Sequence, residues 1–440
     1  MEKSFDRRKW LILILFGLIG QIAWSVENMY FNLFVFERIA ENLNAVTLMV
    51  QLSGIAATVV TLIAGTLSDK FGNRRSFISI GYLIWGVTVA LFGFITPDTV
   101  SSLFGTDRES AVMICLVSVI AGDCVMTLFG STANDAAFSA WVTDNTEPSY
   151  RGKIESVLSI LPLLSTLIVA GGFGIIVEII DYDMMFLALG IVISISGALG
   201  LFIVKDSSEL KKCGSFSDII YGFKPSTVKS NLPLYAALAV VCIFSVACQI
   251  YMPFLIIYMK TYLGFTVVEY SVVFGAAILF AAAINIFLGI YSDKKDKIKL
   301  MYAAAAIYSA GLFCMFLANG MPKVATLVFF GLSGFVMLTG FIFITSLAGA
   351  VVRDNTPADK AGKLQGVRMI FAVLIPMLAG PAIGNAINAA ANVPLSDAGA
   401  DAMTTQYIPS PFVFLAGSLV VLLVIAVLPI LSKLSAKKDN

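Results

Sequence analysis

The sequence predicts an all-α polytopic membrane protein in which twelve transmembrane helices form two six-helix bundles related by a parallel, pseudo-twofold repeat. Three observations lead to this fold class. Hydrophobic residues make up 58% of the 440 residues and charged residues only 13%, whereas soluble domains carry about a quarter charged residues. Twelve segments are apolar over the roughly 20 residues that a helix needs to cross the hydrocarbon. A stretch near the end of the fourth segment also returns near the end of the tenth, which indicates duplication.

We expect the spans at the following positions: 10–36, 45–68, 76–96, 110–140, 153–180, 184–204, 233–260, 267–291, 299–318, 324–352, 363–390 and 411–432. The segment 205–232 is the only long polar stretch near mid-chain, and it contains several lysines and a proline. This composition predicts an N-terminal bundle over 1–204, a cytoplasmic linker over 205–232 and a C-terminal bundle over 233–440.

Two motifs carry the duplication. Residues 140–164 return at 350–374, where Asp144-Asn145-Thr146 matches Asp354-Asn355-Thr356 at an offset of 210 residues. Residues 65–70 return at 289–294, at an offset of 224. The offsets differ because the first half carries a longer polar loop, about Pro97 to Ser110. The chain is therefore two similar halves.

The positions of the basic residues predict the orientation, because loops rich in Lys and Arg stay on the cytoplasmic side. With the N-terminus inside, 25 of the 29 Lys and Arg residues lie on the inner side, and the other four are Arg38, Arg108, Lys260 and Lys323. We therefore expect both termini in the cytoplasm of a cell that carries this protein in its plasma or inner membrane. Six spans per half place both copies of each motif on the same side, as in parallel-repeat transporters.

Composition also excludes several classes of function. The net charge of +1 favours no nucleic acid partner, and the apolar composition makes the lipid bilayer the expected partner. There is no histidine, and the six cysteines have no paired spacing, so we expect no metal site and no cofactor. An enzyme would need a nucleophile–base pair or a metal cluster, and a sensor would need a soluble output domain. Both remain remote alternatives.

The loop between spans two and three, residues 65–75, resembles the signature loop of the major facilitator superfamily, and residues 289–299 resemble its weaker second copy. The loop after span four is similar to that of the glycoside–pentoside–hexuronide:cation symporters and their sucrose-transporter relatives. Members of that group often carry acidic residues in span two, and this span two has none.

The resemblance implies a secondary transporter that moves a small polar solute, most favourably a sugar or glycoside, with a proton or sodium ion by alternating access. No span has an unmistakable dimer motif, and we expect a monomer. Proton-driven efflux of amphipathic compounds and lysolipid transport remain alternatives, because the architecture does not determine the substrate.

The repeated loops predict a cytoplasmic gate. Gly65 would allow two helices to approach closely, and Asp69 would face the positive N-terminus of span eleven in the other half. Arg74, Arg75 and Arg151 would add ion pairs between the halves. The predicted gate residues are Gly65, Asp69, Arg74, Arg75, Asp144, Arg151, Glu155, Gly289 and Asp293.

Ionisable residues inside the membrane are costly and are therefore functional candidates. Span four carries Asp123, Thr127, Ser131, Asn134 and Asp135 at steps of four, four, three and one, which places them on one helical face. An unpaired carboxylate at such a depth can titrate during a transport cycle. We predict that Asp123, Glu27 and Asp135 couple transport to a proton or to sodium, the latter with amide oxygens as further ligands.

Span one places Gln21 and Asn28 on one face and Trp24 on the adjacent face. An aromatic ring beside amides suits a sugar, whose ring stacks while its hydroxyls form hydrogen bonds. The predicted substrate-binding residues are Gln21, Trp24, Asn28, Asn134, Gln249, Tyr251 and Arg368. We further hypothesise an Asp135–Arg368 pair. The alternative for the amides, and for Asn32 and Asn285 in particular, is that they hold helices together.

Overall fold

The computed structural model describes residues 6–146, 151–207, 221–292, 295–357, 361–394 and 407–439, without the side chains at 151–152, 155–156, 361–363 and 437–439. Regular secondary structure in these ranges is helical, and a single isolated β-bridge joins Pro394 and Tyr407. The all-α prediction is confirmed. Contacts divide the chain into two units, with described residues 6–207 in unit 1 and 221–439 in unit 2, so the division falls within the segment expected as the linker.

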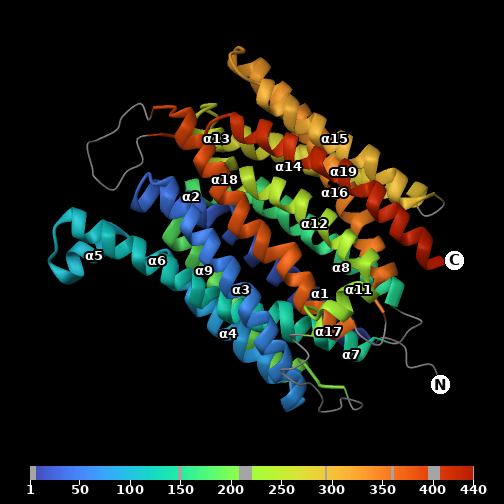
Figure 1. Cartoon of the computed structure of the whole chain (residues 1–440). Coiled ribbons are helices and arrows are strands. Elements are labelled where there is room, and N and C mark those ends of the chain that lie inside the picture. Colours follow the sequence, from blue (N-terminus) through green and yellow to red (C-terminus); the bar gives the residue numbers. More distant parts are fainter. Residues whose placement is uncertain are drawn as a thin grey trace. The chain divides into compact units, whose positions relative to one another are not determined.

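Unit 1 holds the helices drawn from blue to green in Figure 1. They are α1 (Arg7–Val26), α2 (Asn32–Phe34), α3 (Leu43–Phe71), α4 (Arg74–Phe92), α5 (Pro97–Phe104), α6 (Arg108–Gly130), α7 (Ser139–Asn145), α8 (Arg151–Ile168) and α9 (Gly174–Ile203).

Unit 2 follows from yellow-green to red in Figure 1. Its helices are α11 (Pro225–Ser230), α12 (Leu232–Tyr251), α13 (Leu255–Thr261), α14 (Val267–Ser292), α15 (Lys297–Leu317), α16 (Lys323–Asn355), α17 (Ala361–Met369), α18 (Ile375–Ala391) and α19 (Phe412–Asp439).

Eleven helical runs of the described chain are long and apolar enough to cross a membrane, and one of them, Val157–Ile203, is 47 residues long. At about 1.5 Å per residue a straight helix of that length would be roughly 70 Å long, more than twice the hydrocarbon thickness. The run is not straight, because Asp181 inside it has φ 63° and ψ 172°. The break separates spans five and six, and the described residues therefore contain the twelve spans that the sequence predicts.

The connection between spans two and three shows how the sequence shapes the chain locally. Gly72 ends α3 in the left-handed conformation, with φ 61°, which a residue without Cβ adopts at little cost. The Asn73 side chain then accepts a hydrogen bond from the Ser76 amide and caps α4. The corresponding start of span nine is capped by Asp296. These short connections bring basic residues to the first turn of each following helix.

The same pairs of spans pack together in both units. In unit 1, spans one and five (α1, α8), two and four (α3, α6), and three and six (α4, α9) are in contact. In unit 2, spans seven and eleven (α12, α18), eight and ten (α14, α16), and nine and twelve (α15, α19) are in contact. Close packing of α4 on α9 requires small residues, because a Cβ on Gly86 would lie 2.4 Å from the Gly190 carbonyl oxygen. The matching pairs support the duplication.

Two segments expected to be irregular are partly helical. The polar loop about Pro97 to Ser110 contains α5, whose start is capped by Thr96 and whose end is marked by Gly105 with φ 64°. The segment 205–232 contains α11, which begins with Pro225 at a position where its missing N–H costs nothing. The residues that begin or end these helices, Thr96, Gly105 and Pro225, can be read from the sequence. The polar composition of both segments nevertheless led to the expectation of irregular structure.

Five of the twelve spans contain a turn that departs from α-helical geometry. π-helical turns occur at Glu27–Phe31 and Val35–Ile39 in span one, Ser131–Phe138 in span four, Val169–Phe173 in span five and Ile370–Leu374 in span eleven. Span seven is interrupted by the 3₁₀ turn Met252–Phe254, which includes Pro253. Such turns are frequent at functional sites, and those in spans one and four include predicted site residues.

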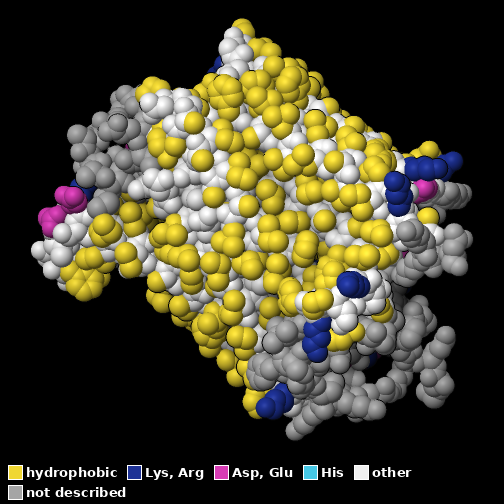
Figure 2. Space-filling model, in the orientation of Figure 1, with side chains coloured by type: hydrophobic (Ala, Val, Ile, Leu, Met, Phe, Trp, Pro, Cys, Tyr) yellow, Lys and Arg dark blue, Asp and Glu magenta, His cyan; other side chains and the backbone are white. Residues whose placement is uncertain are grey.

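Large apolar side chains are exposed along the spans, among them Leu91, Val117, Phe202, Val272 and Leu423. Figure 2 shows that such side chains cover the helix surfaces of the face in view. This is the surface that a bilayer requires, because lipid chains rather than protein solvate it.

Candidate functional site

Two buried carboxylates face one another inside unit 1. Glu27 lies where α1 passes into its π-helical turn and is 8% exposed, while Asp123 lies mid-way along α6 and is 2% exposed. The two groups are close enough for their charges to interact. Span one and span four thus bring two acidic groups, 96 residues apart in the sequence, into one buried region.

Two hydroxyl groups complete this cluster. The Ser53 hydroxyl of α3 donates to Glu27 Oε1 at 2.9 Å and lies 2.8 Å from Thr127 Oγ1. The Thr127 hydroxyl, one turn along α6 from Asp123, lies 3.4 Å from the same Glu27 oxygen. Ser53 faces Asp123 as well. We call Glu27, Ser53, Asp123 and Thr127 the carboxylate cluster.

The cluster has more acceptors than donors. Each hydroxyl supplies one hydrogen, whereas the two carboxylates present four oxygen atoms. Glu27 Oε2 and Asp123 Oδ1 are buried and have no hydrogen-bond partner. Among the described residues no Lys or Arg forms an ion pair with either group. A buried anionic region without a base is stable only when a cation neutralises it.

Asp135 lies on the same span but belongs to a neighbouring group. It accepts a hydrogen bond from the Ser131 hydroxyl at 3.0 Å and lies beside Trp24 of α1. Trp24 packs on Trp85 with ring centroids 4.9 Å apart. Gly130 makes room for this pair, because a Cβ there would lie 2.8 Å from Trp85. A half-buried carboxylate beside an indole ring suits a ligand with hydroxyl groups and an apolar face.

Asn134 points away from this group. Its amide donates to the Tyr82 hydroxyl at 2.6 Å, and the residue is 4% exposed. Gly20 leaves the space that the amide fills, since a Cβ there would lie 1.7 Å from Asn134 Nδ2. The π-helical turn begins at Ser131 and turns less per residue than an α-helix, so Asn134 leaves the face expected from α-helical spacing. Its placement fits a helix-to-helix contact better than substrate binding.

The remaining predicted substrate residues lie in different surroundings. Gln21, Asn28 and Gln249 are half-buried, and the Asn28 amide donates to the Trp24 carbonyl of its own helix. Tyr251 is 2% exposed, and its hydroxyl lies 3.1 Å from that of Tyr308 within unit 2. Arg368 is exposed. The Asp135–Arg368 pair would join the two units and stays a prediction.

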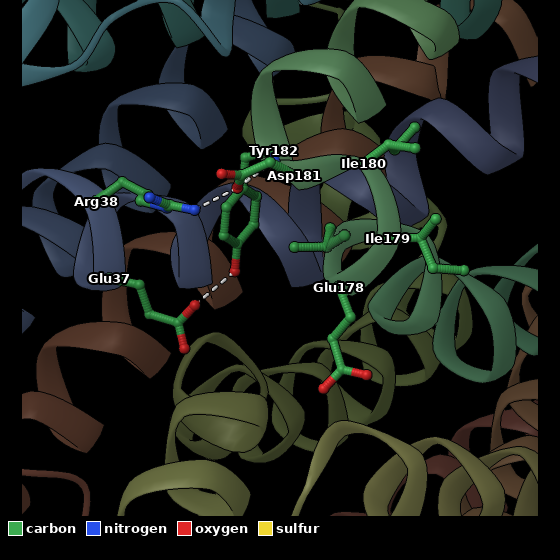
Figure 3. A pocket seen from close by; sticks show the side chains of 8 residues that line it. Glu37, Arg38, Glu178, Ile179, Ile180, Asp181 and Tyr182 are labelled. Carbon is green, nitrogen blue, oxygen red and sulfur yellow. Dashed lines mark hydrogen bonds and ion pairs between the residues drawn. The ribbon is translucent and has the colours of Figure 1, made fainter.

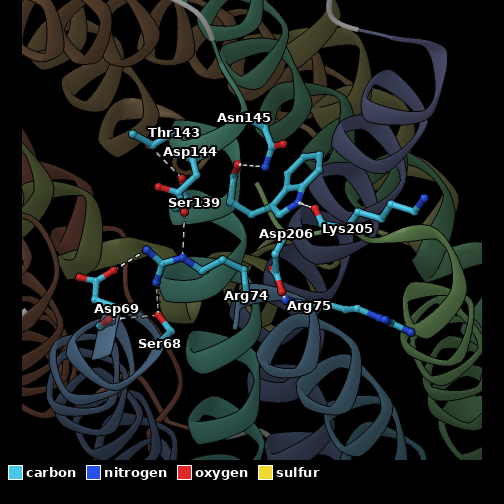
Figure 4. A network of polar contacts seen from close by, with 12 residues as sticks. Ser68, Asp69, Arg74, Arg75, Ser139, Thr143, Asp144, Asn145, Lys205 and Asp206 are labelled. Carbon is cyan, nitrogen blue, oxygen red and sulfur yellow. Dashed lines mark hydrogen bonds and ion pairs between the residues drawn. The ribbon is translucent and has the colours of Figure 1, made fainter. Parts of the chain in front are cut away.

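A second polar network lies at the end of unit 1 where α3 meets α4 (Figure 4). Arg74 is 4% exposed, and its Nε donates to Asp144 Oδ2 at 3.0 Å. Its other nitrogens donate to Ser68 Oγ at 2.6 Å and to Asp69. The start of α4 is therefore bound to the end of α3 and to α7, which follows span four.

These contacts differ from the predicted gate in where they lie. The ion pairs of Arg74 with Asp69 and Asp144 are internal to unit 1, not contacts between the halves. The Arg75 amide donates to Asp206, and its guanidinium to the Leu201 carbonyl at the end of α9.

The glycines of the two signature loops also differ from expectation. A Cβ at Gly65 or at Gly289 would meet no atom within 4 Å, so the expected close helix approach is not found within either unit. Asp293 lies outside the described residues, as do the side chains of Arg151 and Glu155.

The repeated Asp-Asn-Thr motif makes equivalent contacts in both units. Asp144 pairs with Arg74 in unit 1, and Asp354 pairs with Lys297 at 2.6 Å in unit 2. The asparagine and threonine that follow each aspartate donate to the carbonyls four residues earlier, and the four bonds are Asn145 to Trp141, Thr146 to Val142, Asn355 to Val351 and Thr356 to Val352. The motif thus ends a helix and binds it to the start of the neighbouring span.

At the opposite end of unit 1, a cavity of about 730 Å³ lies where span one ends and span six begins (Figure 3). Arg38 pairs with Asp181, and the Tyr182 hydroxyl donates to Glu37 Oε2 at 2.8 Å. The left-handed backbone at Asp181 turns the start of span six toward span one. Sequence patterns did not predict these contacts.

Comparison with known proteins assigns the family. The family model described as the Major Facilitator Superfamily matches residues 10–381. The chain belongs to the major facilitator superfamily. It is an integral, multi-pass membrane protein of a transport family and not an enzyme.

Solved structures agree on the fold of this superfamily. The nucleoside transporter NupG superimposes with a TM-score of 0.66 at 13% identity, covering 97% of this chain and 100% of that one. A mutant of NupG gives 0.67 at 12% identity, with 96% and 99% covered. A bacterial metal transporter gives 0.59 at 14% identity, with 98% and 100% covered. Among curated proteins, none matches this chain.

Ser53 is the member of the carboxylate cluster that sequence reasoning missed. Span two contains no acidic residue, and its single serine at this depth resembles a packing residue. Only the lateral packing of α3 on α6 shows that Ser53 faces both carboxylates.

Proposed function

We propose that this transporter moves a small polar solute, a sugar or a glycoside, together with a proton or a sodium ion by alternating access. The observation that carries the proposal is the carboxylate cluster, in which Glu27 and Asp123 are buried and form no ion pair with any Lys or Arg that the structure describes. Carboxylates are costly inside a membrane and commonly mark ion pathways and proton relays, so this cluster supports binding of a cation.

The cluster suits either cation for a specific reason. A proton needs one carboxylate oxygen and is stabilised by its sharing with the second carboxylate. Sodium is a hard cation that needs several oxygen ligands, which the hydroxyls of Ser53 and Thr127 would supply beside the carboxylates. The two hydroxyl groups therefore distinguish the two ions.

The ion is identified with purified protein by removing these hydroxyls in Ser53→Ala and Thr127→Val. If sodium binds, its affinity falls at least about tenfold in each variant, as expected for loss of a ligand. If only a proton binds, both variants keep proton uptake and the native protein shows no sodium-dependent proton release. Ser333→Ala is the matched control, because Ser333 is a buried hydroxyl of unit 2 whose partner is a carbonyl of its own helix. Absence of both responses in the native protein would refute the coupling site.

Recognition of the solute is proposed for the group around Trp24 and Asp135. An indole stacks on the apolar face of a sugar ring, and a carboxylate accepts hydrogen bonds from two hydroxyls. Gln21 and Asn28 extend along the same helix and are half-buried. Since NupG is a nucleoside transporter, nucleosides belong beside disaccharides and glycosides in the tested panel.

The solute is identified by uptake into proteoliposomes with sodium and pH gradients imposed independently. The proposal expects one class of hydroxylated solute to accumulate, and Trp24→Ala to raise its KM more than Trp10→Ala does. Trp10 lies at the start of α1 against Lys153 and serves as the matched control. Accumulation of amphipathic drugs or lysolipids instead, with no response to sugars or nucleosides, would contradict this assignment.

The proposed orientation places both termini in the cytoplasm of the plasma or inner membrane. It rests on the excess of Lys and Arg in the loops of the Arg74 side. An impermeant thiol reagent should label the Lys229→Cys variant only after the cells are opened. The same reagent should label the Arg108→Cys variant in intact cells. The reverse pattern would invert the topology.

A further inference from the structure

Helix α5 places two large apolar side chains outside the protein. Leu103 is 71% exposed and Phe104 is 68% exposed. The helix itself is well defined by its Thr96 cap and by Gly105 at its end. Figure 1 shows α5 beside the end of α6, away from the other helices of unit 1. Its end therefore carries an apolar surface that the described residues do not cover.

The opposite side of α5 is packed against the protein. Pro97 is buried and Val100 is 7% exposed, and α5 contacts α6. The helix thus has a fixed orientation, with Pro97 and Val100 buried and Leu103 and Phe104 exposed. A flexible loop would not present Leu103 and Phe104 together.

The exposed pair continues the lipid-facing surface of the adjacent spans. Leu91 at the end of α4 is 59% exposed and Phe94, just beyond it, is 40% exposed. Val117 near the start of α6 is 61% exposed. Polar residues flank the pair, because Asp98, Ser102 and Asp107 are exposed as well. An apolar surface next to carboxylates and hydroxyls, at the end of two spans, has the composition of a segment at the lipid–headgroup boundary.

We propose that α5 lies in the membrane interface opposite the Arg74 end, with Leu103 and Phe104 inserted among lipid acyl chains. The bilayer is the occupant because the pair continues a surface that already faces lipid. Because α5 packs on α6, this contact would hold the outer end of span four at a defined depth in the membrane. Asp123 lies further along the same span. The inference does not depend on the solute or on the coupling ion.

The test places the photoreactive residue p-benzoylphenylalanine at Phe104, and separately at Leu103, in the full chain reconstituted into phosphatidylcholine–phosphatidylglycerol vesicles. Illumination should yield a phospholipid adduct, identified by mass, at both positions. Val117 serves as the positive control on a span, and Lys229 in the polar segment before span seven as the negative control. We expect adduct yields at Phe104 within about twofold of those at Val117.

Two results would overturn the proposal. A cross-link to a second copy of the chain would show that the pair forms a protein interface. Absence of a lipid adduct at both positions, while Val117 gives one, would show that α5 stands in water. Each variant is first checked by gel filtration, and the two probe positions guard against one variant failing to fold.

Discussion

The two units share one scaffold but fill equivalent positions with different chemistry. Glu27 and Tyr251 stand 224 residues apart, the offset of the repeated Gly65 motif, and Thr127 and Met337 stand 210 apart, the offset of the repeated aspartate. Within each unit the two equivalent positions meet: the Thr127 hydroxyl lies 3.4 Å from Glu27 Oε1 in unit 1, and the Tyr251 hydroxyl lies 3.4 Å from the Met337 sulfur in unit 2. Where unit 1 has a carboxylate and a hydroxyl, unit 2 has a phenol and a thioether.

The same difference appears in the contact made by the repeated aspartate. In unit 1 Asp144 binds Arg74, whose side chain is 5% exposed, and in unit 2 Asp354 binds Lys297, whose side chain is 35% exposed. The comparison teaches that duplication preserved the helix contacts, while among the described residues the buried carboxylates and the buried arginine all lie in unit 1. We infer that unit 1 carries the cation chemistry and that unit 2 provides the matched, uncharged counterpart.

The largest expected effect is on the rate of solute uptake, and it distinguishes Glu27 from its counterpart Tyr251. Glu27→Gln removes the charge but keeps the shape, and we expect gradient-driven uptake of the identified solute to fall about 5- to 150-fold, the range of typical coupling free energies. Tyr251→Phe should change uptake less than about twofold, because it removes a neutral hydroxyl whose contacts are to Tyr308 and Met337 within unit 2 and leaves the cation site intact. Initial rates in proteoliposomes measure both. Equal losses in the two variants would remove the distinction between the units.

The next effect concerns the repeated aspartate contact. Arg74→Ala leaves Asp144 and Asp69 without their base, and should lower the free energy of unfolding by about 3 kcal/mol, the low end for a buried ion pair, since both carboxylates are partly exposed. Lys297→Ala breaks a largely exposed pair and should cost less than about 1 kcal/mol. Unfolding in mixed micelles gives both values. A larger loss for Lys297→Ala would contradict the comparison.

A smaller effect should be the same in both units. Asn134→Ala removes the bond to Tyr82, and Ser309→Ala removes the bond to Ser418, at 2.9 Å. Hydrogen bonds between membrane helices contribute about 0.6 to 1.7 kcal/mol, so each variant should lose that much stability. Solute affinity should remain unchanged in both. A rise in KM confined to Asn134→Ala would restore the predicted substrate role of Asn134.

The smallest effect distinguishes the starts of spans four and ten. Hydrogen bonds from the Ser110 hydroxyl and amide hold the pKa of Asp107 below its ordinary value, whereas the N-cap of α16, Pro322, offers no side-chain bond. A lowered folded-state pKa gives stability that is fully present above the ordinary Asp pKa of about 3.9 and is lost as the pH falls through the lower, folded-state pKa. Hydrogen exchange at Ser110, corrected for intrinsic rate, should speed up at pH 2.5 relative to pH 5, and exchange at Thr326 should not. No change at Ser110 would show that the cap contributes nothing.

Sequence patterns predicted what depends on neighbours along the chain. Hydropathy located the spans, and the repeated aspartate motif indicated the duplication. Glu27 and Asp123 were recognised singly because charge inside a span is costly. Each of these inferences needed only local composition or spacing.

Features that depend on lateral packing could not be predicted. Ser53 joins the two carboxylates only because α3 packs against α6. The π-helical turn at Ser131–Phe138 rotates Asn134 toward Tyr82, although α-helical spacing placed it with Asp135. Arg74 was expected to bind across the halves, but the short turn after Gly72 returns it to its own unit. The periodicity of a helix in the sequence predicts neither which helix it packs against nor where its turns become π-helical.

The central claim is that the carboxylate cluster couples solute movement to a cation, and one measurement tests it most directly. In proteoliposomes containing the Glu27→Gln, Asp123→Asn double variant, solute accumulation under an imposed proton or sodium gradient is compared with solute exchange at equilibrium. The account predicts that accumulation is abolished while exchange persists, because binding of the solute remains and the cation site is gone. Accumulation at the native level in the double variant would contradict it.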